Sequence, residues 1–271
     1  MKIAFIGGGN MATALVAGLS GQHAGAGSVH VVDPNLEARA RLASQYGVST
    51  GECVDLQVAG CDVVVLAVKP QQMREVAAAL KPQLGDQMLV LSIAAGIRIA
   101  DLSRWLGGYT RIVRAMPNTP ALIGMGITGM VAMPSVDAAQ RQAADDVMRA
   151  VGQTVWLERE ELIDPVTAVS GSGPAYVFYF LEAMQQAAIE MGLDAQQGKE
   201  LALATFTGAA QLAAQSSDPV ELLRQRVTSA GGTTHAAIVS MEASGVKAAI
   251  VKAMKAASAR GRELGDELGK D

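Results

Sequence analysis

The stretch K-I-A-F-I-G-G-G-N-M-A, residues 2–12, decides the fold of this chain. It begins with a short apolar run typical of a buried strand, passes directly into three glycines, and is followed by a helical pattern from Thr13 to Leu19. A strand, a G-x-G-x-x-A turn and a helix in this order are typical of the start of a dinucleotide-binding unit. Gly7 permits the tight turn, Gly9 lets a pyrophosphate approach the backbone, and Ala12 lets the helix pack closely on the strand.

The second predicted strand, Val29–Val32, ends in Asp33, at about the distance from the glycines expected for the residue that meets the adenosine ribose. A carboxylate accepts hydrogen bonds from the ribose 2′-hydroxyl and repels a 2′-phosphate, so Asp33 favours NAD. Asn35 and Arg39 follow, and an arginine that swings over the site would accommodate the phosphate of NADP. The alternative is that Asp33 is a turn residue before Pro34.

Further strand patterns alternate with helical ones up to about residue 160, which predicts a parallel-sheet nucleotide-binding domain. The strand patterns cover Asp62–Val68, Met88–Ile93, Arg111–Ala115, Ile127–Met133 and Thr154–Leu157. Ligands of such sheets bind at the carboxyl ends of the strands, where Lys69-Pro70, Ala94-Ala95-Gly96 and the M-P-N-T-P turn at 116–120 lie. We expect Lys69 to contact a cofactor through its backbone, the alternative being a catalytic lysine.

The pattern changes beyond residue 160, where no further strand is indicated. Helices are predicted at Pro174–Met191, Gln196–Ala214, Pro219–Arg226, Thr234–Ala243 and Val246–Leu264. They are rich in alanine and apolar around much of their circumference, as expected for helices that a partner chain buries. The predicted fold is therefore α/β, with an N-terminal Rossmann-type parallel-sheet domain over residues 1–160 and an all-α domain over 161–271.

The stretch R-V-T-S-A-G-G-T-T-H, residues 226–235, combines hydroxyl side chains with two adjacent glycines just before a helix. The start of a helix presents unpaired N–H groups and a positive dipole end, so a small carboxylate or phosphate would bind there favourably. The alternative is an ordinary loop whose threonine caps the helix. The spacing of the residues does not choose between the two.

Composition excludes several classes of protein. The net charge is −4 and no basic block occurs, which argues against nucleic acid as a partner. Apolar segments are too short to span a membrane, and the start is too short and glycine-rich for a signal peptide, so we expect a cytoplasmic enzyme or binding protein. The two cysteines lack C-x-x-C spacing and the three histidines lack ligand spacing, which predicts neither a redox pair nor a metal site at Cys53, Cys61, His23, His30 or His235.

Five motifs resemble, in order, those of the pyrroline-5-carboxylate reductase family and span nearly the whole chain. They are G-G-G-N-M-A at 7–12, A-V-K-P at 67–70, R-A-M-P-N-T-P at 114–120, S-G-S-G-P-A-Y at 170–176 and V-T-S-A-G-G-T-T-H-A-A-I at 227–238. Many dehydrogenases share the first, whereas the last is specific. The resemblance implies NAD(P)H-dependent reduction of 1-pyrroline-5-carboxylate to L-proline, the last step of proline biosynthesis. It also implies that the helical domain binds substrate and interlocks with a second copy in a homodimer, often within a ring of dimers.

The resemblance also implies roles for individual residues. Together with Asp33 and Asn35 from the strand pattern, the expected cofactor contacts are Ile6, Gly7, Gly8, Gly9, Asn10, Met11, Ala67, Val68, Lys69, Pro70, Ile93, Ala94, Ala95 and Asn118, the last beside the nicotinamide. Ser229, Gly231, Gly232 and Thr233 would hold the substrate carboxylate, and Thr234, the expected catalytic residue, would lie by the ring nitrogen. The family favours NADP(H), whereas Asp33, where the family often has small polar or basic residues, leaves NAD(H) open.

The chemistry of the loop agrees with this reaction. A protonated cyclic imine is already electrophilic and becomes a neutral amine on accepting hydride, so the protein mainly has to orient it. Thr234 is the hypothesised partner of the imine nitrogen, and we expect a structural role for His235. One alternative is a β-hydroxyacid dehydrogenase, but the helix Pro174–Met191 lacks the lysine expected there. A second is a non-catalytic NAD(P)-binding regulator, in which an intact 229–234 motif would not be needed.

Overall fold

The computed structural model of the chain describes residues 1–21 and 28–270, so that His23 lies outside the described residues. The chain forms two compact units. The first comprises Met1–Ser172 and the segment from Ala256 onward, and the second comprises Gly173–Lys255. By packing, residues 161–172 and the end of the chain belong to the first unit. The domain boundary predicted after residue 160 stays a prediction.

The first unit contains an eight-stranded sheet with the order β3-β2-β1-β4-β5-β6-β7-β8 among the described residues. Neighbouring strands of this sheet are parallel, except for the antiparallel pair β6 and β7. The chain passes from β6 to β7 through only a short 3-10 helix, which is too little for the crossover that a parallel pair needs. The predicted parallel sheet is therefore confirmed up to β6, and β7 and β8 run the opposite way. In chain order the strands are Ile3–Ile6, Val29–Val32, Ser49–Gly51, Val63–Leu66, Leu89–Ser92, Ile112–Met116, Gly126–Ala132 and Gly152–Trp156.

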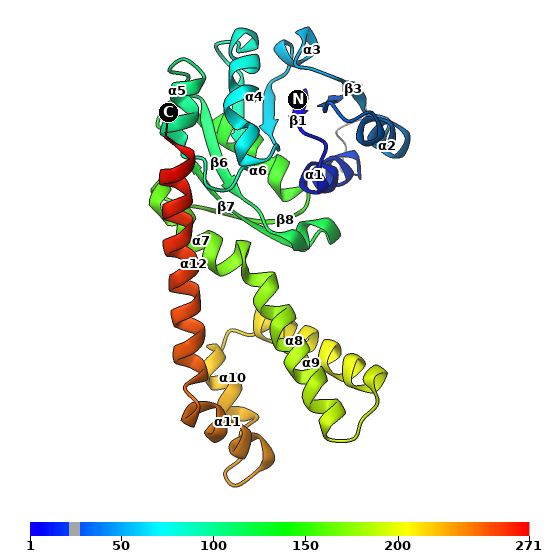
Figure 1. Ribbon diagram of the computed structural model, residues 1–271, viewed down its shortest axis with the longest axis vertical. Helices are drawn as coiled ribbons and strands as arrows, with labels where there is room; N and C mark the ends of the chain where they lie inside the picture. Colours follow the sequence, from blue (N-terminus) through cyan, green and yellow to red (C-terminus); the bar gives the residue numbers. More distant parts are fainter. Residues whose placement is uncertain (22–27, 271) are drawn as a thin grey trace. The chain divides into compact units, whose positions relative to one another are not determined.

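Helices cover both faces of this sheet (Figure 1). Side chains alternate between the faces along a strand, so Ile3 and Phe5 of β1 enter one core while Ala4 and Ile6 enter the other. The first core contains residues of α1, α2 and α6, and the second contains residues of α3, α4, α5 and α7. All residues of β1, β2, β4 and β5 are buried, which is why these strands read as apolar runs, interrupted only by His30 in β2 and Ser92 in β5. The helices are Asn10–Gly21, Leu36–Tyr46, Leu56–Ala59, Met73–Leu80, Ile99–Trp105, Ala138–Arg149 and Ile163–Val166 for α1 to α7.

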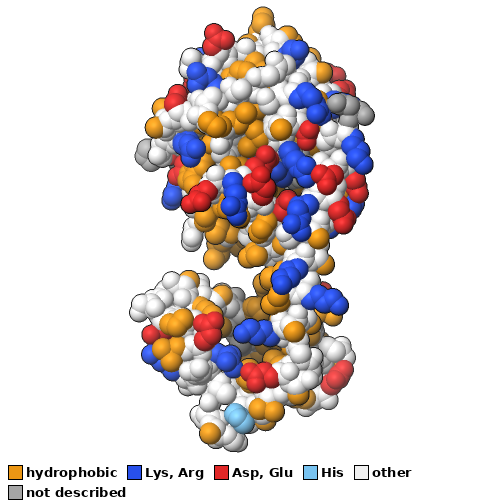
Figure 2. Space-filling model, turned by 90° about the vertical axis from the view of Figure 1, so that its left-hand side faces the viewer, with side chains coloured by type: hydrophobic (Ala, Val, Ile, Leu, Met, Phe, Trp, Pro, Cys, Tyr) orange, Lys and Arg blue, Asp and Glu red, His pale blue; other side chains and the backbone are white. Residues whose placement is uncertain are grey.

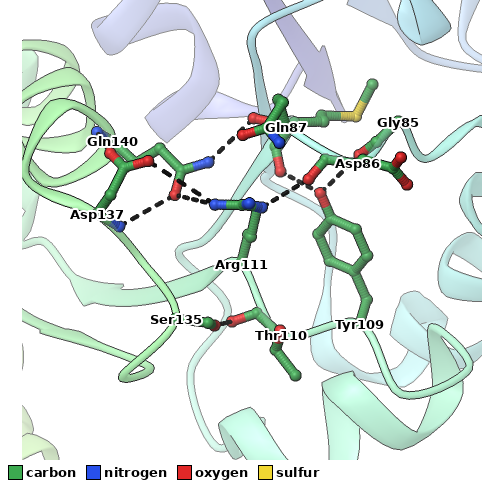
Figure 3. A network of polar contacts seen from close by, with 10 residues as sticks. Gly85, Asp86, Gln87, Tyr109, Thr110, Arg111, Ser135, Asp137 and Gln140 are labelled. Atoms are coloured by element: carbon green, nitrogen blue, oxygen red, sulfur yellow. Dashed lines mark hydrogen bonds and ion pairs between the residues drawn. The ribbon is translucent and has the colours of Figure 1, made fainter.

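A polar network joins the connections before β5 and β6 to the start of α6 (Figure 3). The Arg111 guanidinium donates to the carbonyl of Asp86 at 2.6 Å and to the side-chain oxygen of Gln140 at 3.2 Å. Gln140 in turn donates to the carbonyl of Gln87 at 3.0 Å and closes a capping box with Asp137. Because β5 and β6 begin here, the network lies at the opposite edge of the sheet from their carboxyl ends.

The second unit is helical. It contains α8 (Gly173–Glu190), α9 (Ala195–Gln215), α10 (Val220–Arg226), α11 (Thr233–Ala243) and the first part of α12 (Val246–Leu268). The predicted helices are confirmed, and the described residues after β8 contain no strand. No helix in the described ranges is long and apolar enough to cross a membrane.

The last part of α12 packs in the first unit through its carboxyl end. The Arg98 guanidinium lies 2.7 Å from the Asp266 carboxylate, and Arg104 donates to the carbonyl of Gly269 at 2.8 Å. Cations beside the final carbonyl groups of a helix interact favourably with its dipole. Leu268, which lies between Asp266 and Gly269 in the sequence, packs against the second apolar core.

Candidate functional site

The glycine turn after β1 has the geometry that its sequence predicts. Gly7 has φ = 102° and donates its N–H to the carbonyl of Val32 at 2.8 Å. A Cβ at Gly7 would lie 2.6 Å from the carbonyl oxygen of Ala67, so only glycine fits between β1 and the residue after β4. A Cβ at Gly9 would meet nothing within 4 Å. The backbone at Gly9 is therefore open to a ligand.

A cavity of about 590 Å³ lies at the carboxyl ends of β1, β2 and β4. Ligands of open parallel sheets bind at this edge. The cavity brings together residues that are far apart in the sequence and that were predicted to bind a cofactor, namely Ile6, Gly7, Gly9, Asp33, Asn35, Ala67, Val68 and Lys69. Gly8, Asn10 and Met11 belong to the same turn and to the first turn of α1, although they do not line the cavity.

Part of the cavity wall was not predicted. It comes from the segment after β3, with Glu52, Cys53 and Val54, and from the 3-10 helix η2 (Pro70–Gln72) and α4, with Gln72, Glu75, Val76 and Ala79. β3 has only three residues, S-T-G, none of them apolar, and so gives no strand signal in the sequence. The spacing of apolar residues in α4 does indicate one buried face, formed by Met73, Ala77 and Leu80. It does not indicate which neighbouring side chains would border a ligand.

Asp33 is held in place by backbone groups. Its Oδ2 accepts the Gly8 N–H at 2.6 Å, and its Oδ1 accepts the Asn35 N–H at 2.8 Å. Asn35 caps α2, with its side-chain oxygen accepting the N–H groups of Glu37 and Ala38. The carboxylate thus links the end of β2 directly to the glycine turn, which goes beyond the alternative of a simple turn residue before a proline.

The remaining predicted cofactor residues follow the ends of β4, β5 and β6 and do not line this cavity. Pro70 starts the 3-10 helix η2 (Pro70–Gln72), and Ile93 to Ala95 directly follow β5. Asn118 is buried, and both ends of its side-chain amide are engaged. Its oxygen accepts the Ile127 N–H at 2.9 Å, and its nitrogen donates to the Ser170 carbonyl at 3.2 Å. The structure therefore shows a bridging role for Asn118, and its contact with a nicotinamide stays a prediction.

The loop at 229–234 lies in the helical unit and leads into α11. Gly231 has φ = 73°, and the N–H of Gly232 donates to the Ser229 carbonyl at 3.0 Å, which closes a tight turn. Gly232 occupies the capping position of α11 without a side-chain hydrogen bond. The alternative that a threonine caps this helix is therefore wrong. Thr233 and Thr234 are exposed in the first turn, where helical N–H groups point outward.

The histidines and cysteines do not gather into a metal site in the parts of the chain that the structure describes. His30 is buried, with Nδ1 2.9 Å from the Ser49 hydroxyl. Burial lowers the pKa of His30, and the nearby Asp55 carboxylate opposes this shift. Cys53 is exposed and Cys61 half-buried, and both are free thiols.

The fold and the cavity define a dinucleotide-binding protein of the Rossmann class. Residues 2–96 match the family model "NADP oxidoreductase coenzyme F420-dependent", and residues 160–264 match "Pyrroline-5-carboxylate reductase dimerisation". The pyrroline-5-carboxylate reductase of Pseudomonas aeruginosa is 48% identical over 269 residues, which cover 99% of this chain and 98% of the relative. The chain belongs to the pyrroline-5-carboxylate reductase family.

Solved structures of the family match over nearly the whole length of the chain. A pyrroline-5-carboxylate reductase from Coxiella burnetii superposes with a TM-score of 0.91 at 41% identity, covering 97% of this chain and 98% of that chain. The Plasmodium falciparum pyrroline carboxylate reductase with NADP bound has a TM-score of 0.87 at 28% identity, covering 98% of both chains. The arrangement of a Rossmann sheet followed by a helical dimerisation region is thus a property of the family.

Proposed function

We propose that this chain holds a reduced nicotinamide dinucleotide in the 590 Å³ cavity, grips 1-pyrroline-5-carboxylate at the 229–234 loop, and so reduces it to L-proline. The observation that carries the proposal is the cavity, which gathers the glycine turn, Asp33 and the A-V-K motif at one sheet edge. Gly7 and Gly9 fit a dinucleotide, because one permits the turn and the other leaves backbone open to a pyrophosphate. When bound, the nicotinamide supplies the hydride.

The role of the helical unit in this proposal is to hold the substrate by its carboxylate. The exposed first turn of α11 has no side-chain cap. Because the Gly232 N–H already donates to the Ser229 carbonyl, the backbone offered to a ligand there is that of Thr233 and Thr234. Free N–H groups at a helix start and the positive end of its dipole favour a carboxylate. Ser229 adds an exposed hydroxyl. Carboxylate binding there would leave the ring of the substrate near Thr234.

Thr234 is the proposed partner of the imine nitrogen. Its hydroxyl can accept a hydrogen bond from a protonated imine and can donate one to the amine that forms. No ionisable acid is needed to stabilise an alkoxide, because hydride addition to a cationic C=N produces a neutral amine. The exposed loop therefore needs only to orient the substrate and to exchange one hydrogen bond with its nitrogen.

The test of the Thr234 role compares Thr234→Ala with Thr234→Ser, which keeps the hydroxyl. Loss of a hydrogen bond to a charged group predicts a kcat about 10-fold lower or more for the alanine variant, with an unchanged Kd for coenzyme. Thr234→Ser should retain most of the activity. An alanine variant with undiminished turnover would remove the role from Thr234.

The carboxylate clamp has a separate test with inhibitors. Pyrrolidine lacks the carboxylate of proline, and we expect it to compete with substrate about 10-fold more weakly than proline, or weaker still. Equal inhibition by the two amines would show that the clamp is wrongly placed.

Oxidation of coenzyme on addition of 1-pyrroline-5-carboxylate separates the proposed enzyme from a non-catalytic regulator. The relatives already support the proposed enzyme over a β-hydroxyacid dehydrogenase.

The chain is a homo-oligomer, as the match to the dimerisation family model supports. The helical unit buries few of its own large apolar side chains and exposes many, including Phe178, Tyr179, Met191 and Leu212. Hydrophobic side chains also reach the surface on the face drawn in Figure 2. We propose a homodimer as the building block of a ring of dimers, which light scattering would measure. A cytoplasmic location stays a prediction.

Two observations bear on the choice between NADP(H) and NAD(H). The first family model names NADP, and the Plasmodium falciparum structure holds NADP, which favours NADP(H) by resemblance. Asp33 favours NAD(H) by its charge. The residues around Asp33 bear directly on this choice.

A further inference from the structure

We propose that this chain selects NADH over NADPH, and that the carboxylates of Asp33 and Glu52 reject the 2′-phosphate. The inference rests on the proposed cofactor site, and it concerns the end of the cavity formed by the segments after β2 and β3. A 2′-phosphate is recognised when a cation stands where the ribose binds, and it is rejected when an anion stands there. The surroundings of Asp33 decide which of these applies.

Asp33 presents an anion that cannot easily turn away. Its two oxygens accept the N–H groups of Gly8 and Asn35 at 2.6 and 2.8 Å, which tie the carboxylate to the glycine turn and to the start of α2. The carboxylate still lines the cavity and keeps acceptor capacity for hydroxyl groups. It is therefore positioned to accept hydrogen bonds from a ribose, whereas a phosphate would meet negative charge.

Arg39 is the cation that could have accommodated the phosphate, but the structure engages it elsewhere. One guanidinium nitrogen donates to the carbonyl of Asp33 at 2.6 Å, and another lies 3.9 Å from the Glu52 carboxylate. The Arg39 side chain is only 14% exposed and does not line the cavity. Swinging over the ribose would break both contacts. The side-chain oxygen of Asn35 caps α2, and the amide of Asn35 carries no charge that would offset a phosphate.

The charges around the cavity favour the same conclusion. Among the described residues, its wall carries three carboxylates, those of Asp33, Glu52 and Glu75, and one cation, Lys69. Three acids and one lysine give the wall a formal charge of −2. Two like charges about 4 Å apart near a protein surface repel by an amount that corresponds to roughly 10-fold or more in affinity. The Glu52 side chain is 77% exposed, so salt should screen its part of the effect.

Direct titration of the purified enzyme with NADH and with NADPH tests the proposal without requiring turnover. We expect the Kd for NADPH to exceed that for NADH about 10-fold or more at low salt, and the ratio to shrink as salt is added. In competition against NADH, 5′-AMP should bind more tightly than adenosine 2′,5′-bisphosphate. The ratio of kcat/KM for the two coenzymes should follow the ratio of affinities.

Two variants and a matched control assign the effect to residues. Asp33→Asn and Glu52→Gln each remove one charge with little change in shape, and each should strengthen NADPH binding and narrow the ratio of the two Kd values. Glu37→Gln removes a charge of the same kind from the exposed first turn of α2, outside the cavity wall, and should leave the ratio unchanged. Because the Glu52 side chain is largely exposed, Glu52→Gln should fold even if Asp33→Asn does not.

NADPH affinity equal to or above that of NADH would overturn the proposal, as would a Kd ratio that Asp33→Asn and Glu52→Gln leave unchanged in folded protein. Failure of the proposed function would look different. In that case NADH and 5′-AMP would still bind with the expected preference, but neither coenzyme would be oxidised when 1-pyrroline-5-carboxylate is added.

Discussion

Substitution of the first and third glycines of the turn, Gly7→Ala and Gly9→Ala, should separate folding from coenzyme binding. Both changes add one methyl group within the same three-residue stretch. At Gly7 the methyl group would lie 2.6 Å from the Ala67 carbonyl oxygen in a backbone with φ = 102°. At Gly9 it would meet nothing within 4 Å in the protein.

The magnitudes follow from these contacts. A side chain in a left-handed conformation costs about 1–2 kcal/mol, and overlap with a neighbouring strand adds roughly 1–3 kcal/mol, so Gly7→Ala should cost about 2–5 kcal/mol of unfolding free energy. A loss of about 3 kcal/mol lowers Tm by roughly 6–12 °C in a domain of this size. Gly9→Ala should change the unfolding free energy by about 0.5 kcal/mol or less, since its methyl group contacts only solvent.

The assay has two parts. Thermal unfolding without coenzyme should show the Tm loss in Gly7→Ala alone. Titration calorimetry with NADH at a temperature where both variants are folded should show a Kd raised about 10-fold or more in Gly9→Ala, because the methyl group occupies the approach of the pyrophosphate to the backbone. A Gly7→Ala protein with the Tm of wild type, or a Gly9→Ala protein with the wild-type Kd for NADH, would refute this interpretation of the turn.

Two further predictions concern stability away from the cavity. Gln140→Leu removes the hydrogen bond to the Gln87 carbonyl and one of the hydrogen bonds of Arg111, so we expect the free energy of unfolding in urea to fall by about 1–3 kcal/mol and the Kd for NADH to stay unchanged. For Asp145, burial raises the pKa, but hydrogen bonds from Thr154, Arg149 and Trp156 outweigh it and lower the pKa overall. This stabilisation is present above the unfolded-state pKa of about 3.9 and is lost as pH falls through the lower folded-state value. Asp145→Asn should therefore be less stable than wild type at pH 7, with a smaller difference at pH 2; a constant difference would contradict the assignment.

Local patterns predicted the elements of the fold well. Apart from β3, which was not predicted, the strands of the first unit and the helices of the second begin and end within a few residues of the positions read from apolar periodicity. The β6–β7 pair shows where this reasoning stopped. The alternation of apolar residues along a strand is the same whether the strand runs parallel or antiparallel to its neighbour. The short connection through Thr119–Ile123, which is seen once the strand ends are known, explains why β7 pairs antiparallel with β6.

The candidate site was predicted in part. The glycine turn and Asp33 come together because the carboxyl ends of adjacent parallel strands share one edge, which the order of motifs implies. Glu52 and Glu75 could not be placed in that way. Glu52 follows a three-residue strand that leaves no periodic signal. The spacing of apolar residues in α4 predicts the buried face of that helix, but it does not show that Glu75 borders a cavity.

The sequence by itself determined that a strand, a glycine turn and a helix open a Rossmann sheet, and that a helical region follows it. These features depend on backbone sterics and on apolar spacing within a few residues, which are properties of a continuous segment. Only the tertiary structure decided that Arg39 is held against Asp33 and Glu52, and that Asn118 bridges Ile127 and Ser170. The direction of a polar side chain depends on donors and acceptors that packing brings from distant segments, and a linear pattern does not record them.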